Sequence, residues 1–206
     1  MITTLEELQL KITGTLPLLM CRGQLADPFD TYTKALAKET SLKTKTEDNH
    51  LEISRIKFYG SLYFDDTIGP FLPPDNFFKA LQQAAAKKKK AQIIKSSVLV
   101  KGIVHGLQDP AAAELKYSGP RTIKELWNNG NSPFVHRCMG KPPGQGKVLV
   151  TRAIFPIGWS AQFFLNFDTT YITKDEIVEF ATLAGNIIAI GTWRPKFGQF
   201  SVEVIK

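Results

Sequence analysis

The part of the sequence best suited to binding chemistry is a glycine-bracketed segment, Gly191 to Gly198, near the C-terminus. Within it, cations alternate with aromatic rings: Trp193, Arg194, Lys196 and Phe197. Single-stranded nucleic acid is bound by this mixture, because lysine and arginine neutralise phosphates while flat rings stack on bases. The alternative is a helix-to-strand connection with a left-handed glycine and rings packed into the core. The interleaving of rings and cations favours binding.

A second cationic feature is the run Lys87, Lys88, Lys89 and Lys90 at the predicted C-terminal end of a helix. Cations at this end stabilise a helix without any ligand, because they oppose the partial negative charge of the last carbonyls. Four consecutive lysines exceed what such a role requires. Phosphate neutralisation with counterion release is the other explanation, and it predicts binding that weakens steeply with salt.

The region 106–146 is a third candidate, because it combines basic and aromatic residues with many prolines and glycines. We expect it to be irregular apart from a short helix over 122–127. Long excursions of this kind are usually functional or mobile. It either reaches over a nucleic-acid strand, contacts a neighbouring subunit or is a solvated loop. The basic residues that we assign to the binding site from this region and the strand after it are Arg121, Arg137, Lys141 and Arg152.

Catalytic and metal-binding patterns are weak. The segment 143–148 resembles a phosphate-binding loop, but no hydroxyl follows its lysine and a strand follows where a helix is required, so we reject it. Asp65 and Asp66 form an acidic pair that is either a Mg²⁺ site or a turn. His136 and Cys138 have no second ligand pair at a suitable spacing. We therefore expect no catalytic residue, no metal and no cofactor.

Composition narrows the class of protein. The chain has 206 residues, with 26 Lys and Arg against 19 Asp and Glu, a net charge of +7 and 43% hydrophobic residues. This is typical of a soluble globular protein whose surface suits polyanions. There is no run of about 18 apolar residues and no signal-like N-terminus, so we expect neither a membrane span nor secretion. Two cysteines give no disulfide framework, and we expect a cytoplasmic protein.

These candidate residues must be positioned by a small set of helices and strands. Period-two alternation and β-branched runs predict strands over 8–16, 93–104, 147–155, 160–168 and 200–205. The strands 147–155 and 160–168 read as a hairpin around Pro156–Gly158. Helices are predicted after Asp75, ending in the lysine run, and after the capping box of Thr173 and Glu176.

The order of these elements is strand, helix, strand, strand or hairpin, helix and strand. It predicts an α+β fold with a ferredoxin-like βαββαβ core. Residues 1–206 then form a single domain with two large insertions, at about 22–70 and 106–146. The first insertion contains a polar loop over 40–49 and a short helix that leads into a strand or hairpin.

This architecture resembles the RAMP superfamily, whose RRM-related ferredoxin-like domains include backbone subunits of CRISPR effector complexes. The matching segments are Thr13–Leu18, Phe71–Leu81 and the glycine-bracketed segment before Phe200. The catalytic histidine of RNA-processing members has no match, since Met20–Arg22 occupies that place. The resemblance implies a non-catalytic protein that binds single strands and self-associates along them. The compact form is also similar to bacteriophage versions, which would place it in the host cytoplasm.

Three functions are open at this point. The first is a largely sequence-nonspecific single-stranded DNA or RNA binding protein without a membrane partner. The second is a protein-interaction module that mimics or inhibits a CRISPR effector backbone subunit, as an anti-CRISPR protein does. The third is a metal-dependent nuclease built around Asp65 and Asp66.

Overall fold

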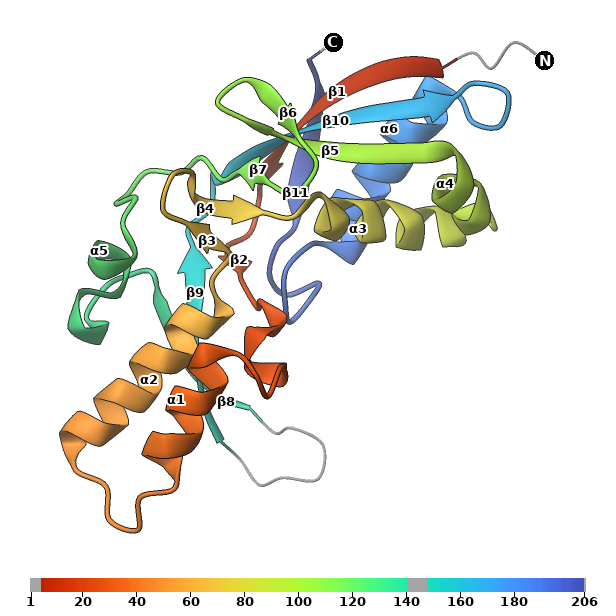
Figure 1. Ribbon diagram of the computed structural model, residues 1–206. Helices are drawn as coiled ribbons and strands as arrows, with labels where there is room; N and C mark the ends of the chain where they lie inside the picture. The colour runs from red at the N-terminus through yellow and green to blue at the C-terminus, as the bar shows by residue number, and fades with distance from the viewer. Residues whose placement is uncertain (1–4, 141–147, 206) are drawn as a thin grey trace.

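The main sheet of the computed structural model contains five antiparallel strands in the order β11-β1-β10-β5-β6 (Figure 1). The structure describes residues 5–140 and 148–205. The strands are β1 (Leu5–Gly14), β5 (Val98–Val104), β6 (Leu107–Asp109), β10 (Ser160–Asp168) and β11 (Phe200–Val204). The central strands β1 and β10 pair in register from Leu5 with Asp168 to Thr13 with Ser160.

Helices α3 (Pro74–Ala86), α4 (Ala91–Ser97) and α6 (Lys174–Leu183) lie on one side of this sheet (Figure 1). On β1, Leu8, Leu10 and Ile12 are buried, while the residues between them are half-exposed, as expected for a strand with one covered face. Phe77 of α3 stacks on Phe163 of β10 with ring centroids 4.6 Å apart. The predicted α+β class is confirmed.

A second sheet, β2-β9-β8, lies beside the first and changes one prediction. Its strands are β2 (Leu18–Leu19), β8 (Val135–Gly140) and β9 (Val148–Phe155). The predicted hairpin of 147–155 with 160–168 is wrong, because β9 pairs with β2 and β8 while β10 belongs to the main sheet. The turn between them instead joins two sheets, and buried Trp159 anchors it by donating from Nε1 to the Leu16 carbonyl at 2.9 Å.

The first insertion is a helical hairpin at the lower end of the molecule (Figure 1). It consists of η1 (Gly23–Ala26), α1 (Thr31–Thr40) and α2 (Glu47–Ser61), followed by β3 (Phe64–Asp65) and β4 (Gly69–Leu72). Helix α2 begins inside the predicted polar loop because Thr46 and Asn49 form a capping box. The segment that was predicted as a polar loop therefore contains the start of a helix.

The second insertion contains more regular structure than expected. It includes β6, β7 (Ala113–Glu114), α5 (Ile123–Trp127), η2 (Asn128–Gly130) and β8. Strand β7 pairs with β4, and β8 runs along β9. The short helix is confirmed, but the prediction of an otherwise irregular region is wrong, because β6 and β8 pair with the strands next to them in sequence and β7 pairs with the distant strand β4.

The strand predicted over 93–104 is helical in its first five residues. Helix α4 continues to Ser97, and Ile94 is fully buried from it, so β5 begins only at Val98. A short β-branched run does not by itself distinguish a buried helix from a strand. The Thr173 capping box, α6 and the last strand are confirmed; α6 continues as the π-helical turn η3 (Ala184–Ile188). No helix of the described ranges is long and apolar enough to cross a membrane.

Candidate nucleic-acid interface

The segment between η3 and β11 is a loop fixed by backbone hydrogen bonds. Thr192 N–H donates to the Leu19 carbonyl at 2.9 Å, and Gly198 N–H donates to the Pro17 carbonyl at 2.8 Å. Gly198 has a φ of +76°, and a Cβ there would lie 1.8 Å from the Ile190 carbonyl oxygen, so only glycine fits. The loop is thereby tied to the segment around β2, next to β9.

The loop places its rings against the β8-β9 ribbon. The ring centroid of His136 on β8 lies 6.1 Å from that of Trp193 and 5.6 Å from that of Phe197. Arg152 is paired with His136 across the ribbon, so the two side chains project from the same face. Together with Lys196, these residues form what we term the aromatic-basic cluster: His136, Arg152, Trp193, Lys196 and Phe197.

Two cations of this cluster lie near its rings. The Arg152 guanidinium is 5.6 Å from the Trp193 ring centroid, and its Nη1 donates to Thr192 Oγ1 at 2.9 Å. Lys196 Nζ is 5.8 Å from the Phe197 ring centroid. Within the described ranges, no carboxylate forms an ion pair with either cation. Their charges are therefore available to an external anion.

The surroundings of the cluster favour the neutral form of its histidine. Partial burial lowers the pKa of His136 below its usual value, and the nearby charges of Lys196 and Arg152 lower it further. A bound phosphate would act in the opposite direction, because a negative charge stabilises the imidazolium. An anion at the cluster would therefore favour the protonated form of His136.

Trp193 is also the accessible tryptophan of the described chain. Its exposed fraction is 37%, against 4% for Trp127 and 0% for Trp159. An aromatic ring that keeps this much surface, beside a guanidinium, offers a stacking platform to a base. The core-packing alternative for this loop therefore does not hold for Trp193.

Arg194 points to the other side of the loop. Its Nη1 donates to Gln83 Oε1 at 3.3 Å, beside an open hollow of about 490 Å³ lined by Gln83, Ile187 and Trp193. Lys79 and Lys87 lie four residues before and after Gln83, so they share its exposed side of α3. The positive surface thus continues from the cluster to α3.

The lysine run is divided between two roles. Lys88 pairs with Glu179, and Lys90 pairs with Glu176 of the α6 capping box. These pairs connect the end of α3 to α6, so half of the run is structural. Lys87 and Lys89 are exposed and form no ion pair within the described residues. Of these two lysines, Lys87 is the one that lies on the side of α3 that faces Arg194.

The remaining predicted site residues are not brought to the cluster. Arg121 donates to the Ile68 carbonyl at 2.7 Å and pairs with Glu114 at 3.3 Å. Arg137 donates to the Gly130 carbonyl at 2.9 Å and lies over Trp127, on the opposite face of β8 from His136. Lys141 lies outside the described residues. Arg121 and Arg137 therefore have structural contacts where binding was predicted.

His136 is the residue that the sequence interpretation missed. The sequence points to His136 only as a metal-ligand candidate without a second ligand pair, but His136 lies on β8 and contacts two rings from the C-terminal loop. The only local signal is that His136 and Arg137 are neighbours on a strand-like stretch, so their side chains are expected on opposite faces. Its neighbours at positions 152, 193 and 197 follow from strand register and packing, which the local sequence does not encode.

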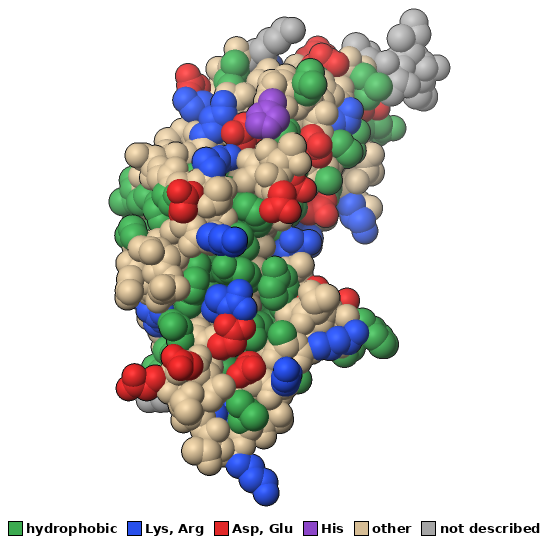
Figure 2. Space-filling view, turned by 60° about the vertical axis from the view of Figure 1, so that its left-hand side comes forward, with side chains coloured by type: hydrophobic (Ala, Val, Ile, Leu, Met, Phe, Trp, Pro, Cys, Tyr) green, Lys and Arg blue, Asp and Glu red, His purple; other side chains and the backbone are tan. Residues whose placement is uncertain are grey.

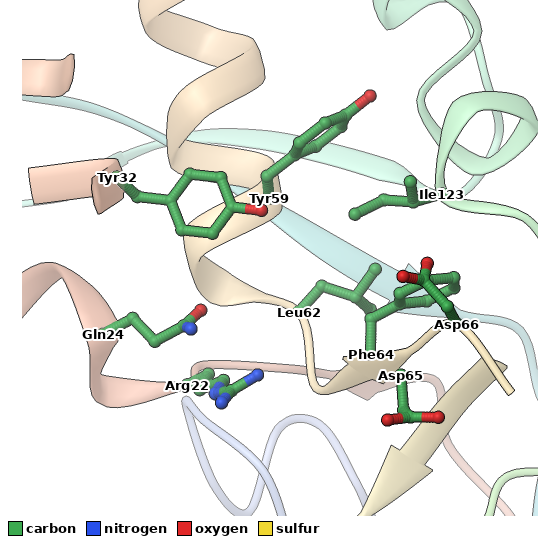
Figure 3. Close-up of a pocket in the computed structure, with 9 residues that line it drawn as sticks. All are labelled: Arg22, Gln24, Tyr32, Tyr59, Leu62, Phe64, Asp65, Asp66 and Ile123. Atoms are coloured by element: carbon green, nitrogen blue, oxygen red, sulfur yellow. The ribbon is translucent and has the colours of Figure 1, made fainter. Parts of the chain in front are cut away.

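The acidic pair lies elsewhere, beside a hollow of about 350 Å³ (Figure 3). Asp65 Oδ1 accepts hydrogen bonds from the backbone N–H groups of Thr67 at 2.8 Å and Ile68 at 3.1 Å, which lowers its pKa. The carboxylates of Asp65 and Asp66 point away from each other (Figure 3). No group of three metal-ligating side chains occurs in the described ranges. These contacts are those of a turn.

Basic side chains are not gathered into a patch on every face of the molecule. Figure 2 shows a face on which basic and acidic side chains are interspersed among apolar ones. The net charge of +7 therefore does not make this face a polyanion-binding surface.

Comparisons with known proteins give likenesses among solved structures. No family model matches the chain, and no curated protein matches it. Among solved structures, it is similar to the crystal structure of Cmr6 from Pyrococcus furiosus, with a TM-score of 0.39 and 11% sequence identity. The alignment covers 99% of this chain and 100% of that chain.

Proposed function

We propose that this protein binds single-stranded DNA or RNA through the aromatic-basic cluster. The observation that carries the proposal is the juxtaposition of an exposed ring, Trp193, with the guanidinium of Arg152 at 5.6 Å. A base stacks on the ring while the guanidinium contacts the adjacent phosphate. Stacking of this kind contributes about 1–3 kcal/mol per base and is tolerant of sequence. The expected binding is therefore largely nonspecific.

A single strand fits this cluster better than a duplex does. In a duplex the bases are stacked on one another, so Trp193 reaches a base face only where a strand is open. The cations Lys196, Arg194 and Lys87 supply phosphate contacts on both sides of the ring. Each phosphate that they neutralise steepens the salt dependence of binding.

We also infer that the core is ferredoxin-like. The framework strands are, in chain order, β1, β5, β10 and β11, and the connecting helices are α3 and α6. In the sheet they lie side by side in the order fourth, first, third and second, which is the ferredoxin-like order. The uncovered sheet face contains Gln9, Lys11 and Gln162, and its Phe164 is only 8% exposed. We therefore assign the stacking role to the loop before β11 and not to the sheet.

We further propose that the protein is a binding protein and not an enzyme. His136 contacts rings and cations, and the contacts within the described ranges include no carboxylate that would orient it as a general base. A histidine in this setting serves as a ring surface and as a group that gains a proton near phosphate.

The test uses fluorescence anisotropy with labelled oligonucleotides of one sequence, as single-stranded DNA, single-stranded RNA and duplex. Single strands are expected to bind more tightly than the duplex, and the affinity is expected to fall steeply as KCl is raised. No binding to either single strand at low salt, or a preference for the duplex, would overturn the proposal. A protein partner that is retained after nuclease treatment in a pull-down would instead favour the interaction-module function.

A further inference from the structure

A third hollow, of about 500 Å³, lies between the start of the helical hairpin and β9. Its lining is mainly apolar and includes Leu25, Ala26, Leu36 and Val150. The groove exists because the segment after β2 stops running beside β9 at Met20. Met20 N–H donates to the Ala153 carbonyl, but Arg22 N–H donates to the Ser61 carbonyl. Beyond Ala153, the side of β9 opposite β8 therefore borders a groove where a neighbouring strand would have continued.

The groove contains a polar group without a partner. Thr151 is 1% exposed, and its Oγ1 forms no hydrogen bond within the part of the chain that the structure describes. A buried hydroxyl in this state is costly, because it has lost water and gained nothing in exchange.

The rim of the groove is positively charged. Arg22, Lys57 and Arg152 surround it. Lys57 donates to the Leu149 carbonyl at 2.8 Å, and partial burial lowers its pKa. Within the described residues, none of the three forms an ion pair. The groove therefore suits an apolar group that carries negative charge beside it.

The same chain presents such a group. Phe29 is 81% exposed, the highest value among the large apolar side chains of the described residues, and Asp27 and Asp30 flank it. The turn is fixed, because Phe29 N–H donates to Asp27 Oδ1 at 2.9 Å and Asp30 Oδ1 accepts from Tyr32 N–H at 2.7 Å. Because the backbone of this turn is already fixed, binding of the ring needs to order only the side chain.

We propose that this groove binds Phe29 of a second copy of the chain, with Asp27 and Asp30 of that copy beside Arg22 and Lys57. Ala26 lines the groove and Phe29 follows it by three residues, so knob and groove lie next to each other on the chain. Two copies related by a two-fold axis form both contacts at once, which closes a dimer. This dimer does not depend on nucleic acid.

The first test is sedimentation velocity of the nuclease-treated full chain over a concentration series. The wild type is expected to form a dimer, and Phe29→Ala is expected to raise the dimer Kd by at least about tenfold. Leu42→Ala is the matched control, since Leu42 is an exposed apolar residue of the same hairpin, and its Kd is expected to match the wild type. A wild type that stays monomeric at every concentration would overturn the proposal, and would leave the groove to another partner. An unchanged Kd for Phe29→Ala would also overturn it.

A charge exchange separates lost contacts from lost folding. Asp27→Lys and Arg22→Glu are each expected to weaken self-association, because like charges then face each other. An equimolar mixture is expected to recover dimers, since both contacts of the mixed dimer pair opposite charges. Two folded variants, checked by circular dichroism, that stay monomeric when mixed would contradict the proposal.

Discussion

Arg152 and Trp193 come from distant parts of the chain, yet the guanidinium lies 5.6 Å from the indole ring centroid. The hydrogen bond from Arg152 to Thr192 Oγ1 uses one of five guanidinium donors. The other donors remain for a phosphate. A contact of this kind contributes about 0.5–1 kcal/mol at exposed sites, so it orients the arginine more than it stabilises the fold.

The first prediction concerns Arg152. Replacing it with alanine is expected to weaken single-strand binding about tenfold, which corresponds to the lower end of about 1.5–3 kcal/mol for a hydrogen bond to a charged group. The matched control is Arg137→Ala, because Arg137 lies on the other face of the same ribbon and contacts Gly130 and Trp127. That variant is expected to keep the wild-type affinity and to unfold at lower urea. Equal losses of affinity in both variants would contradict the placement of the interface.

The second prediction separates the two roles of the lysine run. Lys90→Met is expected to lower the free energy of unfolding by about 0.5 kcal/mol, because it removes the pair with Glu176. Lys87→Met is expected to leave stability unchanged and to reduce the salt slope of binding by about 1. Urea unfolding and anisotropy across a KCl series measure the two effects. The reverse assignment of effects would refute the division.

The Lys90 contribution also has a defined pH dependence. The hydrogen bond from Lys90 lowers the pKa of Glu176, so the folded state favours the carboxylate. The stabilisation is present above the ordinary carboxyl pKa and is lost as the pH falls through the lowered value. The difference in unfolding free energy between wild type and Lys90→Met should therefore shrink in acid. A difference that grows in acid would exclude this pair as its source.

The third prediction concerns His136. Its pKa in the free protein is lowered by burial and by Lys196 and Arg152, whereas a bound phosphate raises it. Binding is therefore coupled to proton uptake, and affinity should rise as the pH falls from the higher pKa of the complex to the lower pKa of the free protein. His136→Gln should remove that component. NMR titration of the imidazole with and without oligonucleotide gives both pKa values, and an unchanged pKa on binding would place the strand away from the cluster.

Much of the framework could be predicted from local sequence. The alternation in β1, the Thr173 capping box and the last strand each depend on residues close in the chain, and all three are confirmed. Partner choice could not be predicted in this way. The alternation of β9 and β10 is the same whether they pair with each other or join separate sheets, and the burial of Trp159 between them decides the outcome.

The candidate site shows the same division. Its loop could be found because Trp193 and Lys196 are close in sequence. His136 and Arg152 could not be assigned to it together, because their meeting depends on the β8-β9 register and on the packing of the loop against it. The pairing of Lys90 with α6 is likewise a tertiary contact, so the charge run alone overstated the binding surface.

Stacking of a base on Trp193 can be followed by intrinsic tryptophan fluorescence. Trp127 and Trp159 are buried, so quenching by a single-stranded oligonucleotide reports mainly on Trp193. We expect quenching in the wild type, loss of the quenching but retained affinity in Trp193→Phe, and an affinity loss of about 1–3 kcal/mol in Trp193→Ala. Binding that leaves the fluorescence unchanged, or equal affinity of Trp193→Ala and wild type, would contradict this stacking.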